Sequence, residues 1–361
     1  DKIPIYSIDA AHMLDKRIGY IKVSRFAKTT MDELREALVD LKKEGMKDLV
    51  LDLQGNGGGM LRTAIEMSDE FLSEDKLIVY TEGRSFERDN TYAQYKGLFE
   101  KGRLVVLVDE ASASASEIVS GAVQDWDRGL VIGRRSFGKG LVQRPMRLPD
   151  GSAVRLTVQK YYTPAGRCIQ KPYDDGVEAY RKEKFERYER GELMSLDSLE
   201  LPDSLLFQTR IQKRDVYGGG GILPDLFVPL DTTYKLGTFS SILRKGLCSK
   251  YALEQVDAGR QDWEARHPDE TAFVKDMTFT DAEIESFKAF LVVEGIDIDQ
   301  EEWARSLPAI RLRLKAFYGR NIYNSRTFYR VIGGLNEALQ EAVRVLNDGT
   351  FKAANLAHRT F

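Results

Sequence analysis

The chain has 361 residues, 42% apolar and 30% charged, which is typical of soluble globular proteins and long enough for about two domains. Its 53 basic and 56 acidic residues are spread along the chain and give a formal net charge of -3, so nothing indicates a nucleic-acid or membrane-binding patch. No apolar run approaches the roughly 20 residues that span a bilayer. Because the sequence starts at Asp1 without Met or a signal peptide, we expect a processed or truncated chain whose targeting segment has been removed.

Over the first 160 residues, segments with the hydrophobic pattern of a strand alternate with segments that have the hydrophobic pattern of a helix. Ile18 to Val23 and Asp48 to Leu53 are predicted strands, and Thr30 to Glu33 is a capping-box sequence that starts a helix between them. The pattern continues in chain order with a helix over 60–72, strands over 77–81 and 104–108, a helix over 114–126 and a strand over 129–132. Strands that alternate with helices predict a mainly parallel α/β core.

The pattern changes after Gly140. Residues 141–148 and 152–162 are strand-like and flank Pro149-Asp150-Gly151, so a β-hairpin is predicted. A polar insertion follows over about 165–213, and its charged run over 180–193 is interpreted as a solvated helix. Four glycines at 218–221 then precede ILPDLFVPL, which is predicted to return to the core as a strand.

The chain beyond Asp231 is predicted to be helical. Thr280 to Glu283 forms another capping box, and apolar residues recur at helical spacing between Phe328 and Leu346. The predicted organisation is therefore a lead-in at 1–17, an α/β core at 18–232 and an all-α domain at 233–361. Cys168 and Cys248 lie far apart in no metal-binding spacing, and a single disulfide between them stays open.

Gly133 to Gly140, GRRSFGKG, matches the G-x-x-x-x-G-K part of a phosphate-binding loop. Gly140 stands where Ser or Thr would bind magnesium, and a hairpin follows where a helix N-terminus would supply anion affinity. These two departures argue against nucleotide binding. Lys139 therefore has another role, or is a surface lysine in a turn.

Asp109 to Ile118, DEASASASEI, joins a predicted buried strand to a helix. Ser114 and Glu117 fit a capping box, so one interpretation is that Ser114 only caps its helix. The alternative is a nucleophile, because a serine that opens a helix lies beside unpaired backbone amides that can hold an oxyanion.

Histidine is the usual base for a nucleophilic serine, and this chain has only His12, His267 and His358, none of them in a motif. A Ser-Lys dyad is the alternative that the sequence offers. Such a lysine must be neutral, although its reference pKa is about 10.4, and burial can lower that pKa by several units. Lys139, preceded by Phe137 and flanked by glycines, could be threaded into an apolar pocket of this kind.

These segments, together with Leu51 to Gly59 (LDLQGNGGG), Gln124-Asp125 and Val142-Gln143, resemble the carboxyl-terminal processing proteases, also called tail-specific proteases. The resemblance covers roughly Ile18 to Leu230. It implies a serine endopeptidase with a Ser/Lys dyad on a crotonase-like (ClpP-like) mixed α/β core, which needs no metal or other cofactor.

The same resemblance assigns roles to individual residues. It implies that Ser114 is the nucleophile, Lys139 its general base and Gln143 an orienting residue, while Asp125 matches an acidic position whose role stays open between chemistry and structure. The backbone amides of Ala115 and Gly59 are the implied oxyanion hole, and we consider Gly58 the nearest alternative to Gly59.

The chain departs from the family pattern in the loop 54–59 and before residue 1. Gln54 stands where the family often has Arg, and Gly57 to Gly59 lack a common proline. No PDZ domain, which binds the substrate's C-terminal tail in the family, is recognisable in the sequence given. The family further implies a protein or peptide substrate, a periplasmic or cell-envelope location and dimerisation through the C-terminal helices.

Two other functions are compatible with the same fold class. The first is a catalytically silent module that binds a peptide or an apolar ligand. The second is an acyl-CoA enzyme of the crotonase type, although such enzymes do not need a serine and a lysine at this spacing. Nucleic acid is not an expected partner.

Overall fold

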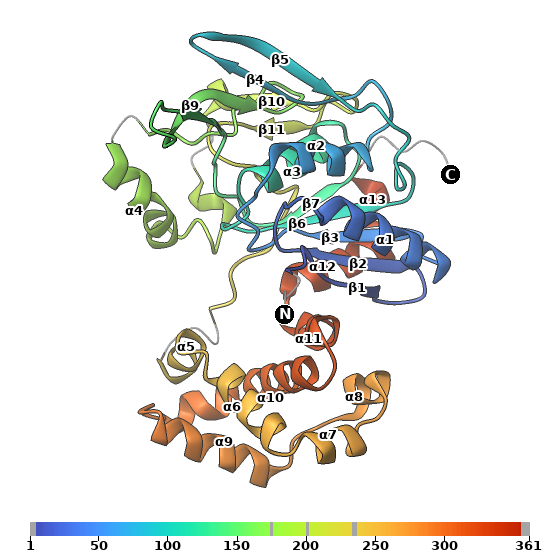
Figure 1. The fold of residues 1–361 in the computed structure, drawn as a ribbon, viewed down its shortest axis with the longest axis vertical. Helices are drawn as coiled ribbons and strands as arrows, with labels where there is room; N and C mark the ends of the chain where they lie inside the picture. The colour runs from blue at the N-terminus through green and yellow to red at the C-terminus, as the bar shows by residue number, and fades with distance from the viewer. Residues whose placement is uncertain (1–4, 174–175, 200–201, 233–236, 355–361) are drawn as a thin grey trace. The chain divides into compact units, whose positions relative to one another are not determined.

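The computed structural model describes residues 5–173, 176–199, 202–232 and 237–354 (Figure 1). The chain forms two compact units. The first contains the described residues up to Pro229 and those from Glu341 onward, and the second contains Leu230–Gln340.

The first unit is a mixed α/β structure. Its strands are β1 (Ile8–Met13), β2 (Ile18–Val23), β3 (Asp48–Asp52), β4 (Leu77–Gly83), β5 (Phe86–Tyr92), β6 (Leu104–Val108), β7 (Leu130–Gly133), β8 (Leu141–Arg147), β9 (Ala153–Tyr162), β10 (Leu206–Gln208), β11 (Asp215–Tyr217) and β12 (Leu226–Phe227). Its helices up to Pro229 are α1 (Thr30–Lys43), α2 (Leu61–Asp69), α3 (Ala115–Asp125), α4 (Gly176–Glu189) and the short 3₁₀ turns η1 (Leu196–Ser198) and η2 (Asp203–Leu205).

The main sheet has the strand order β1-β2-β3-β6-β7-β12. Strands β2, β3, β6, β7 and β12 are parallel to their neighbours, and β1 pairs antiparallel with β2 at the edge. A second, antiparallel sheet has the order β5-β4-β9-β8, and β10 pairs with β11. The mixed α/β core predicted from the sequence is confirmed, and so is the hairpin formed by β8 and β9.

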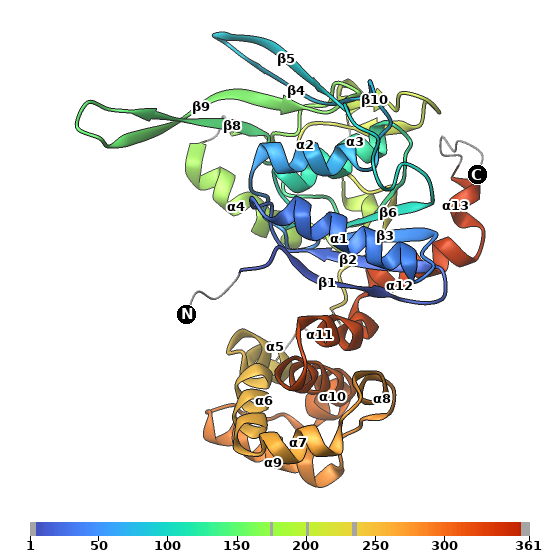
Figure 2. The same cartoon turned by 45° about the vertical axis from the view of Figure 1, so that its right-hand side comes forward.

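The hydrophobic core of the first unit lies between the two sheets, around α2 and α3 (Figures 1 and 2). Alternate residues of β3 and β6, such as Leu51 and Val106, belong to this core and are fully buried. Leu34 and Leu38 of α1 recur at helical spacing and bury the inner face of that helix. This core packing holds the main sheet in place, and the sheet in turn positions the loops that follow its strands.

Two details differ from the predictions for the N-terminal region. Residues 8–13 are not a lead-in but the edge strand of the main sheet. The capping box expected at Thr30 is not formed. Thr29 is the N-cap residue and makes no side-chain cap hydrogen bond, and the Glu33 carboxylate accepts hydrogen bonds from the amides of Ser7 and Ile8. Glu33 therefore fastens β1 to α1.

The second unit is helical. Its helices are α5 (Gly237–Arg244), α6 (Leu247–Ala258), α7 (Arg260–Arg266), α8 (Glu270–Asp276), α9 (Asp281–Val293), α10 (Gln300–Ile322) and α11 (Ser325–Ile332), with the 3₁₀ turn η3 (Gly333–Leu335). The capping box predicted at Thr280 and Glu283 is formed. A separate core includes the fully buried residues Ile242, Phe287 and Leu314. The predicted helical C-terminal region is confirmed.

The end of the helical region differs from the expected domain at 233–361. The helical periodicity is interrupted at Gly333, where α11 ends, and α12 (Glu337–Asn347) then crosses from the second unit into the first. The short helix α13 (Thr350–Ala353) belongs to the first unit. Residues 233–236, where the predicted boundary falls, lie outside the described residues.

Both cysteines are free thiols, Cys168 half-buried in the first unit and Cys248 buried in the second. Among the helices that the structure describes, none combines the length and the apolarity required to cross a membrane.

Candidate active site

Four of the predicted site residues, Ser114, Ala115, Gly59 and Lys139, lie where three parallel strands end. The loops that follow β3, β6 and β7 contain Gly55–Gly59, Asp109–Ser114 and Arg134–Lys139 respectively. Because the carboxyl ends of parallel strands meet at one edge of the sheet, segments far apart in the sequence come together there.

Ser114 stands at the first turn of α3 with a strained backbone. It is half-buried, it is the N-cap residue, and its φ of 57° and ψ of -109° are unusual for a residue other than glycine. Strain of this kind costs on the order of 1–3 kcal/mol and is concentrated at functional sites. The amide of Ala115, the next residue, has no hydrogen-bond partner among the described residues, as expected for the first turn of a helix.

The glycine loop after β3 lies directly against Ser114. A Cβ atom on Gly58 would lie 2.8 Å from the Ser114 Cβ and 3.0 Å from the Ala115 amide nitrogen, so only glycine fits there. The Gly58 amide donates to Asn56 Oδ1, at 2.9 Å. The Gly59 amide has no partner within the described part of the chain, and of the two competing glycines it is therefore the one with a free donor.

Lys139 is exposed, which differs from the buried lysine expected from its neighbours. Its Nζ makes no hydrogen bond or ion pair to any residue in the described ranges, Ser114 included. The flanking glycines serve close backbone packing instead: a Cβ on Gly138 would lie 3.1 Å from the Lys171 Cβ, and one on Gly140 would lie 2.6 Å from the Gln170 amide nitrogen. The backbone of the loop is buried while the lysine side chain projects outward.

A buried carboxylate connects the serine and lysine segments. Glu117 Oε2 accepts hydrogen bonds from the amides of Ser114 and Lys139, at 2.7 and 2.9 Å. Its other oxygen, Oε1, accepts from Ser136 Oγ and from the Gly138 amide, both at 2.6 Å. One side chain thus fixes the backbone of both predicted catalytic residues.

Burial raises the pKa of Glu117, which is fully enclosed. The four hydrogen bonds from Ser136, Lys139, Gly138 and Ser114 oppose this shift because they stabilise the charged form. The ionisation of Glu117 therefore depends on whether the two loops around it keep their hydrogen-bond donors in place.

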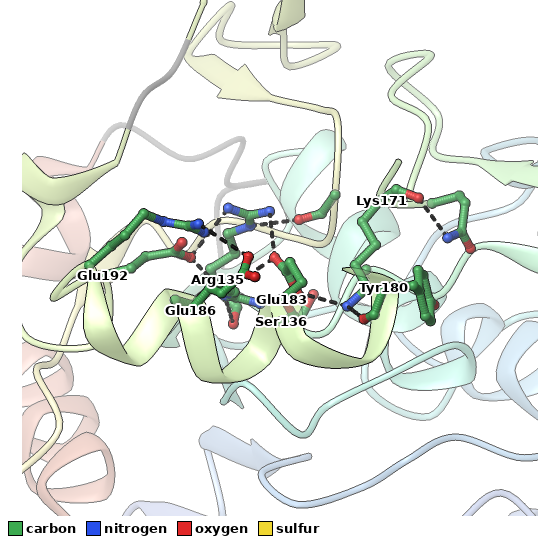
Figure 3. Close-up of polar contacts among 12 residues, drawn as sticks. Arg135, Ser136, Lys171, Tyr180, Glu183, Glu186 and Glu192 are labelled. Carbon is green, nitrogen blue, oxygen red and sulfur yellow. Dashed lines mark hydrogen bonds and ion pairs between the residues drawn. The ribbon is translucent and has the colours of Figure 1, made fainter. Parts of the chain in front are cut away.

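Helix α4 is attached to the back of the lysine loop by buried charges. Arg187, which is 1% exposed, donates to the carbonyl oxygens of Arg135 and Ser136 at 3.0 and 3.1 Å and pairs with Glu192 at 2.8 Å. Arg135 pairs with Glu192 as well and donates to the Gly220 carbonyl (Figure 3). Burial, and secondly the charge of Arg187, lowers the pKa of Arg135.

Lys171 is the buried lysine of this region. Its Nζ lies 2.7 Å from Glu183 Oε2 and 3.2 Å from the Tyr180 carbonyl oxygen, both on α4 (Figure 3). The same ammonium stands 4.4 Å from the ring centre of Phe137 and 4.2 Å from that of Tyr180. The charged segment that the sequence indicated to be solvated is therefore partly buried, and it holds Phe137 two residues before Lys139.

Gln143 lies on β8, four residues beyond Lys139, and is exposed. It pairs in register with Thr157 of β9. The two strands form a hairpin that extends away from the rest of the first unit (Figure 2).

Asp125 lies at the opposite end of α3 from Ser114, at about 15 Å by the helical rise per residue. Its carboxylate is fully buried and binds Arg167 Nη2 at 2.5 Å and the Ala165 amide at 2.7 Å. These contacts fasten the chain after β9 to the helix. We therefore interpret Asp125 as a structural residue.

Among the described residues of the first unit, no histidine lies in the site. His12 lies on β1, three strand spacings or about 14 Å across the sheet from β6. His267 belongs to the second unit, and His358 lies outside the described residues. In the described ranges, His, Cys, Asp and Glu side chains form no group of three or more that could hold a metal ion.

The sequence indicated Ser114 and Lys139, but not the residues that hold them. Glu117 carried a signal, since it occupies the capping-box position of α3. Lys171 and Arg187 carried none, because their burial depends on a helix that folds back onto the loop from more than 30 residues away in the chain.

Comparisons with known proteins identify families for two parts of the chain. Residues 17–179 match peptidase family S41, and residues 238–324 match DUF8443, a family of unknown function. A carboxyl-terminal-processing protease of Picosynechococcus is 40% identical over 158 residues, 43% of this chain and 37% of the relative. The carboxy-terminal processing protease CtpA of Bacillus subtilis is 38% identical over 171 residues, 47% of this chain and 36% of the relative.

Other similar proteins have related descriptions. The chloroplastic C-terminal processing peptidase of Tetradesmus obliquus is 37% identical over 156 residues, 43% of this chain and 33% of the relative. The chain thus spans about a third of the length of these curated relatives. Among solved structures, a photosystem II D1 C-terminal processing protease aligns with a TM-score of 0.42 and 33% identity, over 47% of this chain and 46% of that one.

Proposed function

The chain belongs to peptidase family S41 through residues 17–179, and from this premise we propose that it is a serine endopeptidase with Ser114 as nucleophile and Lys139 as general base. The observation that carries the proposal is the shared acceptor Glu117 Oε2, which binds the amides of both residues. A carboxylate in this position keeps the two segments in register, although they are 25 residues apart in the sequence.

The proposed reaction is acyl transfer to Ser114. Lys139 Nζ, in its neutral form, accepts the Ser114 Oγ proton as Oγ attacks the scissile carbonyl carbon. The developing oxyanion accepts hydrogen bonds from the amides of Ala115 and Gly59, which are unoccupied among the described residues. Lys139 then protonates the leaving amine, and water hydrolyses the acyl-enzyme.

Because Lys139 is exposed, its side chain must move before the reaction can begin. Its side chain has to turn toward Ser114 and lose its contact with water, because a hydrated ammonium is a poor base. A substrate strand that covers the loop would remove this water. We interpret the observed arrangement as a resting state whose backbone is already placed.

We propose that the substrate binds as an added strand along β8. Strand β9 pairs with β8 over residues 153–160 and with β4 over residues 160–162, so near the site the free edge belongs to β8. Pro145 supports this choice because proline is tolerated in edge strands. Gln143, at the start of β8, would orient the bound chain beside Lys139.

Proteolysis of an unstructured protein such as casein tests the proposal. We expect Ser114→Ala and Lys139→Ala each to lose at least about a thousandfold in kcat/KM. The half-buried Ser73 and the exposed Lys43 lie outside the site, and Ser73→Ala and Lys43→Ala are matched controls. Equal activity in all five proteins would eliminate the dyad, and no activity in any of them would favour a silent peptide-binding module.

The remaining proposals concern the whole protein. From the relatives, which include bacterial and chloroplast processing proteases, we propose protein substrates cleaved near unstructured C-terminal tails, a location outside the cytoplasm and a PDZ domain that recognises the tail. Homo-oligomerisation through the helical unit is supported by Leu253, Val292 and Val293, which are 49%, 61% and 84% exposed. Light scattering of Val292→Asp/Val293→Asp would test it: an unchanged mass would contradict an oligomer built on this face.

A further inference from the structure

A basic cavity of about 890 Å³ lies in the first unit, at the edge of the main sheet opposite to Ser114. It is lined where β2, β3 and β6 begin, whereas the candidate active site lies where β3, β6 and β7 end. Four segments contribute: 16–17 before β2, 42–48 between α1 and β3, 99–103 before β6, and Leu346, Asn347 and Lys352 from the C-terminal part of the chain.

Seven cationic side chains line this cavity, and one acidic residue does. The cations are Lys16, Arg17, Lys42, Lys47, Lys101, Arg103 and Lys352, and the acid is Asp48. The chain as a whole has a net charge of -3, so this concentration of positive charge is local and does not reflect a basic composition.

The only lining carboxylate within the described residues is already neutralised. Arg103 binds Asp48 through two nitrogens, Nε at 2.8 Å and Nη2 at 2.5 Å, and Asp48 is buried. Arg103 Nη1 donates to the Leu346 carbonyl, which fixes the C-terminal wall of the cavity. Arg17 Nη2 also lies 3.5 Å from Asp48 Oδ2. Asp48 is therefore shared by the two lining arginines and offers little compensation to the five lining lysines.

Four of the five lining lysines have no acidic partner among the described residues. Lys16, Lys47, Lys101 and Lys352 are exposed and form no ion pair with any described residue. Lys42 donates to the carbonyl of Leu98, which satisfies a hydrogen bond without removing the charge. Like charges gathered around one cavity repel each other, and a bound polyanion would relieve that repulsion.

We propose that this cavity binds a ligand that carries several phosphate groups. A divalent metal ion is disfavoured, since metal ions of that class need carboxylate ligands and Asp48 is engaged by Arg103. Single-stranded nucleic acid is disfavoured because Phe99, the only aromatic residue in the described lining, is 2% exposed and offers no face for base stacking. Several lysine ammonium groups around a compact hollow match the charge density of a polyphosphate.

Occupancy of this cavity would join the C-terminal part of the chain to the sheet. Lys352 follows Phe351, which is buried with its ring 5.9 Å from the Arg103 guanidinium carbon. A ligand held by Lys47, Lys101 and Lys352 would bridge the two walls and raise the melting temperature of the first unit. It would not compete with substrate, because it binds at the opposite ends of the strands.

Calorimetric titration of the whole chain with inorganic tripolyphosphate at physiological salt tests the proposal. We expect saturable binding that weakens by about tenfold in Lys47→Gln/Lys101→Gln, since each exposed ion pair contributes modestly. The control Lys28→Gln/Lys182→Gln removes the same charge at exposed positions of the first unit that do not line the cavity, and it should bind like the wild type. Melting temperatures of the free proteins confirm that both variants fold.

Co-sedimentation with vesicles identifies the source of the phosphate. Binding to phosphatidylcholine–phosphatidylglycerol vesicles that the cavity variant loses and the control keeps would assign a lipid headgroup, and binding of tripolyphosphate alone would assign a soluble ligand. The proposal is overturned if the wild type binds neither probe, or if both double variants are weakened equally.

Discussion

At the scale of single residues, Glu117 organises the candidate site. Four donors converge on its carboxylate, two of them the amides of Ser114 and Lys139. A group that accepts on both oxygens cannot be replaced by an amide without turning an NH₂ toward two donors. The placement of the dyad therefore depends on a residue that takes no part in bond making.

We expect Glu117→Gln to lower the free energy of unfolding by about 2–3 kcal/mol, because two buried donors lose their acceptor. It should also lower kcat more than KM, since the backbone of Ser114 and Lys139 is displaced. Chemical denaturation and steady-state proteolysis measure the two effects. A variant with wild-type stability and kcat would show that the carboxylate does not position the loops.

The raised pKa of Glu117 predicts a specific pH dependence. Between its ordinary value of about 4.5 and the raised folded value, the unfolded chain has released a proton that the folded protein retains. The contribution of Glu117 to stability is thus complete below the ordinary value and is lost as the pH rises through the folded one. The difference in unfolding free energy between the wild type and Glu117→Gln should shrink over that interval, and a difference that grows would contradict the shift.

Asp125 illustrates a structural role in a position that the sequence left open. Asp125→Asn should lower the melting temperature, because Arg167 loses its buried partner, yet kcat of the folded protein at low temperature should stay near that of the wild type. A large loss of kcat without a loss of stability would instead assign Asp125 a chemical role.

At the scale of elements, α4 supports the lysine loop from behind. Arg187 and Lys171 are 1% and 2% exposed, and both reach the segment 135–138. Buried cations are stable only when they are paired, so the helix and the loop depend on each other. We infer that α4 keeps the Lys139 loop in one conformation.

Arg187→Ala should destabilise the protein by about 3 kcal/mol, because Glu192 and two carbonyl oxygens lose their donor. In Arg187→Ala, the amides of residues 135–140 should exchange hydrogen faster than in the wild type, whereas the amides of β6 should exchange at the wild-type rate. Hydrogen-exchange mass spectrometry measures both rates. Arg181→Ala, at an exposed position of the same helix, should change stability by less than about 0.5 kcal/mol. Equal exchange in both variants would contradict the inference that α4 keeps the Lys139 loop in one conformation.

The sequence predicted elements with strong local signals and missed those that depend on distant partners. The strands 18–23 and 104–108 were predicted at their observed bounds, since each is a short apolar run that is buried throughout. β5 was missed because its residues are mostly exposed and polar, so only pairing with β4 makes it a strand. Lys139 was expected to be buried because Phe137 precedes it, yet Phe137 packs on Lys171.

At the scale of the whole molecule, two hydrophobic cores are separate. One lies in the α/β unit and includes Leu51, and the other lies in the helical unit and includes Leu314. Units with independent cores can unfold independently. The Ser114 and Lys139 loops lie in the first unit, and so does Glu117, which binds the amides of both residues.

Differential scanning calorimetry should show two transitions. Leu314→Ala, which removes a fully buried side chain at a cost of about 2–5 kcal/mol, should lower only one of them, and Leu51→Ala should lower only the other. If both variants shift a single common transition, the units fold cooperatively.

The central claim is that Ser114 is a nucleophile activated by Lys139, and covalent labelling with a fluorophosphonate tests it most directly. Ser114 Oγ would attack phosphorus and expel fluoride, which leaves one phosphonyl ester that peptide mass spectrometry can locate. We predict a single adduct on Ser114 in the wild type and in Lys43→Ala, none in Ser114→Ala and much slower labelling in Lys139→Ala. An adduct on another residue of the wild type, or a labelling rate unchanged by Lys139→Ala, would contradict the assignment.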